Sequence, residues 1–179
     1  MKYLLVIIDP QNDFTHEDGH YVTRHGICQI AAAKSRINLL TDSKQYDKII
    51  VRADYQPGQF IPGVSLALPG TFGYEIDAGI VVPVNMAIFN KCAHSCFSSG
   101  DFQNLLAKSA CDTLLLCGFL AEYCIRQTGL DATTAGYHVI LVKDAIGTGD
   151  DVQYRREAVL EELAQKGCTL LDAADCLKL

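Results

Sequence analysis

Short runs of apolar, often β-branched residues alternate along the chain with stretches of helical periodicity. The apolar runs are continuous rather than alternating with polar residues, which is typical of parallel strands covered on both faces. They predict strands over residues 3–8, 48–52, 80–83, 113–117, 138–142 and 168–171. The helical patterns predict helices over residues 28–40, 101–108, 125–135 and 152–166, with Asp101 as the N-cap of the second. This repeated order predicts an α/β protein with a three-layer α/β/α Rossmann-like fold and a mostly parallel, roughly six-stranded sheet.

The chain has the length of one domain, so residues 1–179 are predicted to form a single unit. One long irregular region, rich in glycine and proline, runs from residue 53 to about residue 79. A loop of this length inside a compact domain is usually functional or disordered.

Composition narrows the classes of partner. The net charge is −6 and the sequence has no basic patch, which argues against a nucleic-acid partner. No apolar stretch reaches the roughly 20 residues that span a bilayer, so no membrane partner is expected. The first apolar run meets Asp9-Pro10 rather than a small-residue cleavage site, which favours a strand over a signal peptide. The eight cysteines are therefore expected to be reduced thiols, the compartment to be the cytoplasm, and the partner to be a small-molecule substrate.

Three reactive residues fall at or just beyond the carboxyl ends of predicted strands, where open parallel sheets bind ligands. Asp9 ends the first strand, Lys91 follows the apolar run 86–89, and Cys124 lies past the strand that ends at residue 117. Each has an ordinary explanation on its own, as a turn former, a solvated lysine and a buried cysteine. Together they are chemically complete, because a carboxylate can accept the thiol proton while an ammonium stabilises both anions.

The position of Cys124 near the start of a predicted helix adds to this interpretation. Unpaired backbone N–H groups and the helix dipole favour negative charge there, which predicts a lowered pKa for the thiol. The N–H groups of the preceding turn can also stabilise an oxyanion.

Four segments and one lysine then follow in a recognisable order. They are residues 7–14 (IIDPQNDF), residues 69–76 (PGTFGYEI), Lys91, residues 118–124 (GFLAEYC) and residues 142–145 (VKDA). In this order they resemble the isochorismatase-like cysteine hydrolases, a family that includes nicotinamidases, and the resemblance covers essentially the whole chain.

The resemblance implies a catalytic triad of Asp9, Lys91 and Cys124. Asp9 would be the general base and then the acid for the leaving amine, Lys91 would hold the charge, and Cys124 would form a thioester that water hydrolyses. It also implies a cis peptide bond between Leu120 and Ala121, which would turn the amides of Ala121 and Cys124 toward an oxyanion.

The resemblance extends to the substrate pocket and to assembly. Phe14, Tyr123 and Gln56 are expected at the pocket, although Gln56 fits a loop glutamine bonded to backbone equally well. Self-association into a homo-oligomer is also expected.

One loop departs from the nicotinamidase pattern. Nicotinamidases bind a metal through an aspartate and two histidines after the second strand, and here Asp54 is kept while Gln56 and Phe60 stand at the two histidine positions. Phenylalanine cannot coordinate a metal and a glutamine amide is a poor ligand for zinc-like ions. Residues 92–96 (CAHSC) match no structural zinc spacing either. No metal and no other cofactor is therefore predicted.

Three functions remain open from the sequence. The first is a metal-independent hydrolase that uses Cys124 to cleave a C–N bond in a small amide or ureido substrate. The second is an isochorismatase-type hydrolase that acts through Asp9 without the cysteine, which the Gln56-Pro57 pair favours. The third is a binding or scaffold protein that has kept the fold and lost turnover.

Overall fold

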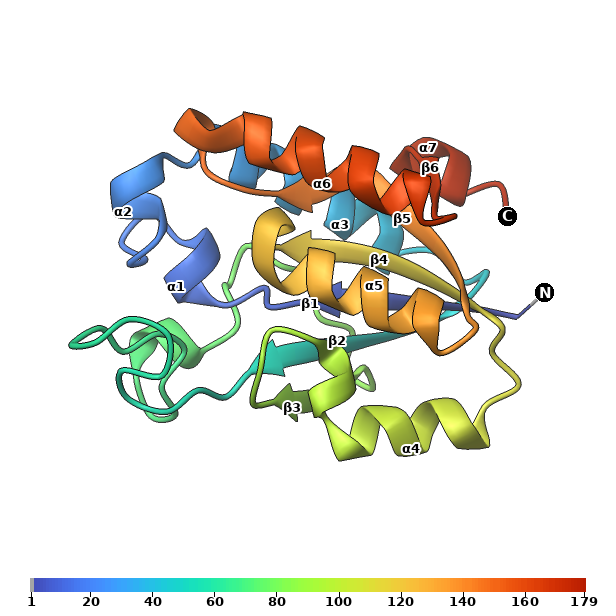
Figure 1. Cartoon of the computed structure of the whole chain (residues 1–179), viewed down its shortest axis with the longest axis horizontal. Coiled ribbons are helices and arrows are strands. Elements are labelled where there is room, and N and C mark those ends of the chain that lie inside the picture. Colours follow the sequence, from blue (N-terminus) through green and yellow to red (C-terminus); the bar gives the residue numbers. More distant parts are fainter. Residues whose placement is uncertain (1) are drawn as a thin grey trace.

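A parallel sheet forms the middle of the molecule, with helices on both of its faces (Figure 1). The computed structural model describes residues 2–179. The strands, given in their order across the sheet, are β3 (Ala87–Lys91), β2 (Asp47–Ala53), β1 (Tyr3–Ile8), β4 (Thr113–Phe119), β5 (His138–Gly147) and β6 (Thr169–Leu171). Every neighbouring pair is parallel. The predicted three-layer α/β fold is confirmed.

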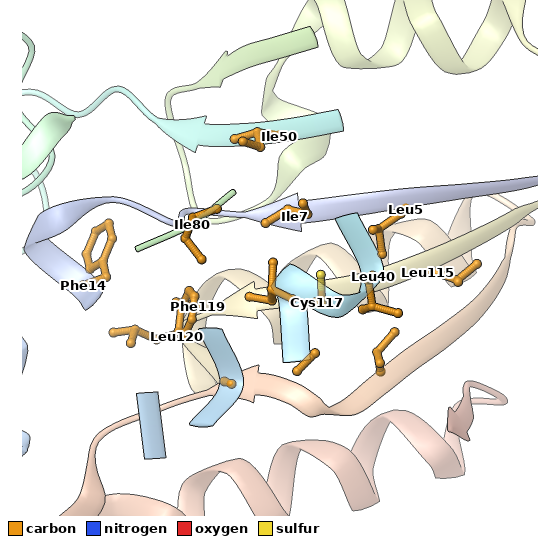
Figure 2. Close-up of a cluster of buried hydrophobic side chains, with 14 of the residues drawn as sticks. Leu5, Ile7, Phe14, Leu40, Ile50, Ile80, Leu115, Cys117, Phe119 and Leu120 are labelled. Atoms are coloured by element: carbon orange, nitrogen blue, oxygen red, sulfur yellow. The ribbon is translucent and has the colours of Figure 1, made fainter. Parts of the chain in front are cut away.

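Successive side chains of each strand point to opposite faces, so the strands supply two separate parts of the core. On one face, Leu5 and Ile7 of β1 lie with Leu115 and Cys117 of β4 and with Leu40 of a covering helix (Figure 2). On the other face the intervening residues of the same strands pack together, among them Leu4, Val6, Ile8, Leu114 and Leu116. Because both faces are buried, these strands are apolar throughout, which is why their sequences show no alternation.

The helices divide between the two faces. The first face is covered by α3 (Cys28–Thr41) and α7 (Ala173–Cys176), and α3 buries one stripe of residues, Ile30, Ala33, Ile37 and Leu40. The second face is covered by α4 (Gly100–Lys108), α5 (Arg126–Thr134) and α6 (Gln153–Gln165). Two short helices, α1 (Asn12–Thr15) and α2 (Val22–His25), lie beyond the carboxyl ends of the strands (Figure 1). Within residues 2–179 no helix has the length and apolar character needed to cross a membrane.

The third strand lies later in the chain than predicted. The expectation of a strand over residues 80–83 is wrong, because these residues are irregular and the strand is β3. Ile80 is buried in the core while Val81 and Val82 are exposed, and Pro83 has no N–H for a ladder. As an edge strand β3 is mostly exposed, and its apolar run is as short as that of residues 80–83, although its last residue is fully buried.

Two helix starts also differ from the sequence prediction. Ser99, not Asp101, is the N-cap of α4, and its hydroxyl accepts a hydrogen bond from the N–H of Phe102. The helix predicted from residue 125 is α5, which begins at Arg126 because a π-helical turn, η3 (Ala121–Ile125), precedes it. This turn carries Cys124 and forms part of the candidate site.

Candidate active site

Three side chains from distant parts of the chain meet at the carboxyl end of the sheet. Asp9 follows β1, Lys91 is the last residue of β3, and Cys124 lies in η3 after β4. Lys91 Nζ is 2.9 Å from Asp9 Oδ2 and 3.4 Å from Cys124 Sγ. All three residues are at most 5% exposed. The structure therefore brings together the three residues that the sequence singled out.

The backbone at Asp9 is unusual for a residue other than glycine. Its φ is +48°, in the left-handed region that L-residues seldom adopt. The Asp9 N–H donates to the carbonyl of Val51 in β2, so the residue is still tied to the sheet. Such conformations cluster at functional sites, which supports a role for this carboxylate.

The turn that carries Cys124 depends on a glycine at the end of β4. Gly118 has a φ of +118°, and a Cβ there would lie 2.1 Å from the carbonyl oxygen of Ile8 in β1. Three residues after Gly118 the chain enters η3, and the carbonyl of Leu120 accepts hydrogen bonds from the N–H groups of Tyr123 and Ile125 in this turn. The close approach of β4 to β1 therefore places the turn directly beside Asp9.

The cis peptide bond lies one residue before its predicted place. It joins Phe119 to Leu120, not Leu120 to Ala121. The backbone of Leu120 is extended, and its peptide bond to Ala121 is trans. Ala121 is the buried first residue of the π-helical turn. The motif could place the turn only to within one residue, since the point where β4 ends is set by its pairing with neighbouring strands.

A buried glutamine holds the ends of β1 and β2 together below the site. Gln11 donates from Nε2 to the carbonyls of Ala53 and Tyr74, both at 2.9 Å, and accepts from the Ala53 N–H at 2.8 Å. Nearby, Asp13 accepts from the N–H of Ala67 in the long loop. In the motif of residues 7–14, these side chains organise the loop while Asp9 faces the site.

Two further residues reach the thiol, and the sequence did not predict them as a part of the site. Tyr55 Oη accepts a hydrogen bond from Lys91 Nζ at 2.9 Å and lies 3.5 Å from Cys124 Sγ. His94 Nδ1 is 3.8 Å from the same sulfur. Tyr55 lies close to a predicted strand end, a signal that many residues share, and His94 belongs to the segment of residues 92–96 that was weighed only as a metal site.

Burial, rather than the helix dipole, decides the proton affinity of the thiol. Burial and the nearby Asp9 carboxylate raise the pKa of Cys124 to about 12, and Lys91 offsets only part of this shift. The predicted lowering of this pKa is therefore wrong, because the sequence showed the helix start and not the surrounding burial. At neutral pH the thiol is protonated and needs a base.

Asp9 and Lys91 have the charges that such a site requires. Burial raises the pKa of Asp9 above the usual carboxyl value, while Lys91 and hydrogen bonds oppose that rise. Burial disfavours the charge on Lys91, but Asp9 and Cys124 outweigh it and raise the pKa of the ammonium. Lys91 Nζ also donates to the carbonyl of Ala93 at 2.9 Å, which satisfies another of its protons. A carboxylate with a raised pKa is a better acceptor for the thiol proton than an ordinary one.

A cavity of about 360 Å³ opens onto the thiol, a size suited to a small molecule. Phe14 and Tyr123 line it, and Leu120 forms part of its wall. Figure 2 shows Phe14 beyond the end of β1, on the same side of the core as Leu120.

Gln56 does not reach this cavity. Its side chain is exposed, and its N–H donates to Gln59 Oε1. Two other residues of the loop, Tyr55 and Phe60, line the cavity instead. The structure therefore does not bring Gln56 together with the other predicted substrate contacts.

The long loop does not fit the metal site that the resemblance implies for nicotinamidases. Asp54 Oδ2 accepts from Asn90 Nδ2, and the Phe60 ring stacks on His94 with the centroids 4.2 Å apart. In the part of the chain that the structure describes, no three His, Cys, Asp or Glu side chains are grouped so as to hold a metal ion. With an aromatic ring and an exposed amide at the two histidine positions, this donor set does not suit a zinc-like ion.

One protein-family model matches almost the whole chain. The isochorismatase domain model matches residues 3–175. The chain belongs to the isochorismatase family. The relatives in this family are hydrolases, and the chain is therefore an isochorismatase-family hydrolase.

Two relatives in this family show the range of similarity. The chain is 27% identical over 179 residues to the nicotinamidase/pyrazinamidase of Mycobacterium tuberculosis, covering 89% of this chain and 92% of that protein. It is 26% identical over 177 residues to a secreted isochorismatase effector of Verticillium dahliae, covering 96% of this chain and 88% of the effector.

Solved structures of isochorismatase-like proteins share the fold. A protein from L. infantum in complex with nicotinate has a TM-score of 0.82 at 21% identity, covering 97% of this chain and 93% of that one. The N-carbamoylsarcosine amidase of Thermoplasma acidophilum has a TM-score of 0.80 at 23% identity, covering 97% of each chain. At these identities the likeness shows the fold alone.

Proposed function

We propose that this protein is a cysteine-dependent hydrolase that cleaves a C–N bond of a small amide or ureido substrate through a thioester. One observation carries the proposal: the buried Lys91 ammonium contacts both the Asp9 carboxylate and the Cys124 thiol at the cavity. Relatives named as nicotinamidase/pyrazinamidase and as N-carbamoylsarcosine amidase support an amide or ureido substrate.

The first step forms a bond between Cys124 Sγ and the carbonyl carbon of the substrate. The thiol proton passes to Asp9, and the carbonyl electron pair moves onto the oxygen. The backbone amides of Ala121 and Cys124, in the first turn after β4, are the proposed donors to this oxyanion. Lys91 stays charged and offsets the negative charge on the sulfur as it develops.

The second step breaks the C–N bond. Asp9 returns its proton to the leaving nitrogen, the oxyanion re-forms the carbonyl, and ammonia or an amine departs from a thioester on Cys124. Water then adds to the thioester while Asp9 takes its proton. The C–S bond breaks, the acid product leaves, and the thiol regains the proton from Asp9.

A panel of small amides with detection of released ammonia tests this function. Cys124→Ala and Asp9→Asn are each expected to lower kcat/KM by at least about 100-fold. The matched control is Cys92→Ala, an exposed cysteine beside Lys91, which should keep full turnover. Intact-mass analysis of rapidly quenched enzyme should show an acyl adduct that maps to Cys124.

Two results would replace the proposal with another function. Full turnover in Cys124→Ala together with its loss in Asp9→Asn would indicate an isochorismatase-type reaction through Asp9. Absence of both ammonia release and an acyl adduct across the panel would indicate a binding protein.

A further inference from the structure

The cavity above Cys124 has a basic wall, although the protein is acidic overall. The net charge is −6, yet His20, Arg24, His25 and Arg155 all line the cavity. Among the described lining residues the one carboxylate is Asp9, which is already paired with Lys91. The basic groups come from the segment around α2 and from α6.

His94 also lines the cavity and stacks on Phe60. Of the other four side chains, two already have acidic partners. His25 Nδ1 lies 3.0 Å from Asp151 Oδ1, and Arg155 Nη1 lies 3.5 Å from Glu122 Oε1. Glu122 is held in place by the hydroxyls of Tyr21 and Thr148. The side chains of His25 and Arg155 are therefore already bound within the protein.

Arg24 and His20 have no such acidic partner in the part of the chain that the structure describes. Within residues 2–179, Arg24 has no carboxylate or carbonyl partner for its guanidinium. His20 Nε2 is buried in the described structure and has no hydrogen-bond partner there. A buried polar atom without a partner is costly unless a bound molecule or water satisfies it. Both groups line the same cavity as Cys124.

We propose that the substrate carries a carboxylate that binds Arg24 and His20 while its amide or ureido carbonyl lies at Cys124. The guanidinium fork matches the two oxygens of a carboxylate, and an N–H at Nε2 of His20 can donate to one of them. This inference rests on the proposed function for the reacting end and extends it to the other end of the substrate.

The remaining wall fits a short hydrocarbon or aromatic spacer between the two ends. Its residues are apolar or aromatic, including Phe14, Phe60, Ile61, Leu66 and Leu120. The substrate class is therefore a small carboxylic acid that bears an amide or ureido group, rather than a neutral amide.

Matched probes that differ only in the carboxylate test the inference. The pairs are 3-carbamoylbenzoate with benzamide, and succinamate with butanamide. In at least one pair the acid is expected to have a kcat/KM about 10- to 100-fold above that of the neutral amide. Arg24→Gln should lower this ratio at least about tenfold, and Arg24→Lys should keep part of it, because lysine retains the charge and loses the fork.

The matched control is Arg36→Gln. Arg36 is ion-paired with Asp144 outside this cavity, so its replacement should leave both activities and their ratio unchanged. If neither pair shows a preference for the acid, or if Arg24→Gln leaves the ratio unchanged, the inference is overturned.

A binding measurement separates this inference from the proposed function. Calorimetry on Cys124→Ala, which needs no turnover, should show the acid of a pair binding at least about tenfold more tightly than the amide, with the preference lost in Cys124→Ala/Arg24→Gln. Equal binding of acid and amide contradicts the inference even where Cys124 is acylated. Arg24-dependent binding without any acylation of Cys124 supports it and contradicts the cysteine mechanism.

Discussion

Asp9 is expected to have opposite effects on the reactivity of Cys124 and on catalysis. Its charge raises the pKa of the thiol, so the resting thiolate population should increase when the charge is removed. As the base, however, Asp9 has to take the thiol proton during attack. We therefore expect Asp9→Asn to speed the alkylation of Cys124 by iodoacetamide at pH 7.5 while kcat/KM falls by about 100-fold or more.

Peptide-resolved mass spectrometry measures this alkylation, with the exposed Cys92 as an internal reference. The matched control is Asp54→Asn, a carboxylate that is bonded to Asn90 and does not line the cavity. Asp54→Asn should change neither the alkylation rate of Cys124 nor kcat/KM. Slower alkylation in Asp9→Asn would mean that Asp9 supports the thiolate at rest.

Tyr55 is expected to act as a donor to the sulfur. Burial and the nearby Cys124 and Asp9 raise its pKa, so its hydroxyl keeps its proton, and this hydrogen bond lowers the pKa of Cys124. Without that donor in Tyr55→Phe, the pH profile of Cys124 alkylation should move to higher pH, and kcat should fall about tenfold. Tyr137→Phe, away from the cavity, serves as the control. An unchanged pH profile would contradict the role as donor.

At the residue scale, the sequence predicted the site residues that stand in motifs and missed the properties that depend on burial. Asp9, Lys91 and Cys124 stand in recognisable segments at strand ends, whereas Tyr55 and His94 have no such pattern. The pKa of Cys124 was predicted in the wrong direction because a helix start is visible in sequence, while the distance to a buried carboxylate is not.

Among the elements, the junction of β1 and β4 is expected to tolerate substitution poorly. In Gly118→Ala the new Cβ meets the backbone of Ile8, and the φ of +118° is unfavourable for alanine. We expect a loss of about 3 kcal/mol or more in the free energy of unfolding, with loss of activity as η3 shifts. Chemical denaturation measures this change.

The matched control is Gly100→Ala at the start of α4, where a Cβ would meet nothing within 4 Å. Alanine favours helix over glycine, so this variant should be unchanged or more stable by up to about 1 kcal/mol. Equal stability of the two variants would show that the approach of Gly118 to Ile8 is not tight in solution.

The accuracy of the element predictions follows burial. The strands β1, β2 and β4 lie inside the sheet and were predicted to within two residues at each end, because burial on both faces forces continuous apolar runs. The start of β5 was predicted as well, but the strand continues five residues beyond the predicted end, through the half-buried Lys143 and Asp144 that interrupt its apolar run. The edge strand β3 was placed too early, since the apolar residues 80–83 of the preceding loop match a short strand as well as the run 86–89 at the start of β3 does. The cis bond at Phe119–Leu120 was displaced by one residue for a related reason, as strand pairing rather than the motif sets the end of β4.

For the whole molecule, the site joins strands that are not all neighbours in the sheet. β1 and β4 are adjacent, but β2 lies between β1 and β3, so the buried Lys91 reaches Asp9 across the end of β2. A buried ion pair contributes little stability over apolar residues, but the loss of one partner leaves an uncompensated charge. The fold should therefore lose more stability when one charge of the pair is removed than when both are removed together.

Lys91→Met is expected to lower the free energy of unfolding by about 3–5 kcal/mol, or the Tm by about 6–20 °C. The double variant Asp9→Asn/Lys91→Met should recover most of this loss, although both are inactive, because neither charge is then buried alone. Differential scanning calorimetry of the two single variants and the double variant measures the coupling. A double variant that shows the sum of the two single losses would contradict a direct interaction.

The stability of Lys91→Met is also expected to depend on pH. The pKa of Asp9 is raised by burial even beside Lys91, and without the ammonium that opposes the rise it goes higher still. A carboxyl group whose folded pKa exceeds its unfolded value stabilises the fold at low pH, and this stabilisation is lost as the pH rises through the folded pKa. Relative to the unmodified protein, Lys91→Met should therefore be less destabilised at pH 5 than at pH 8. A destabilisation that is equal at both values, or larger at pH 5, would show that Asp9 does not carry the unpaired charge.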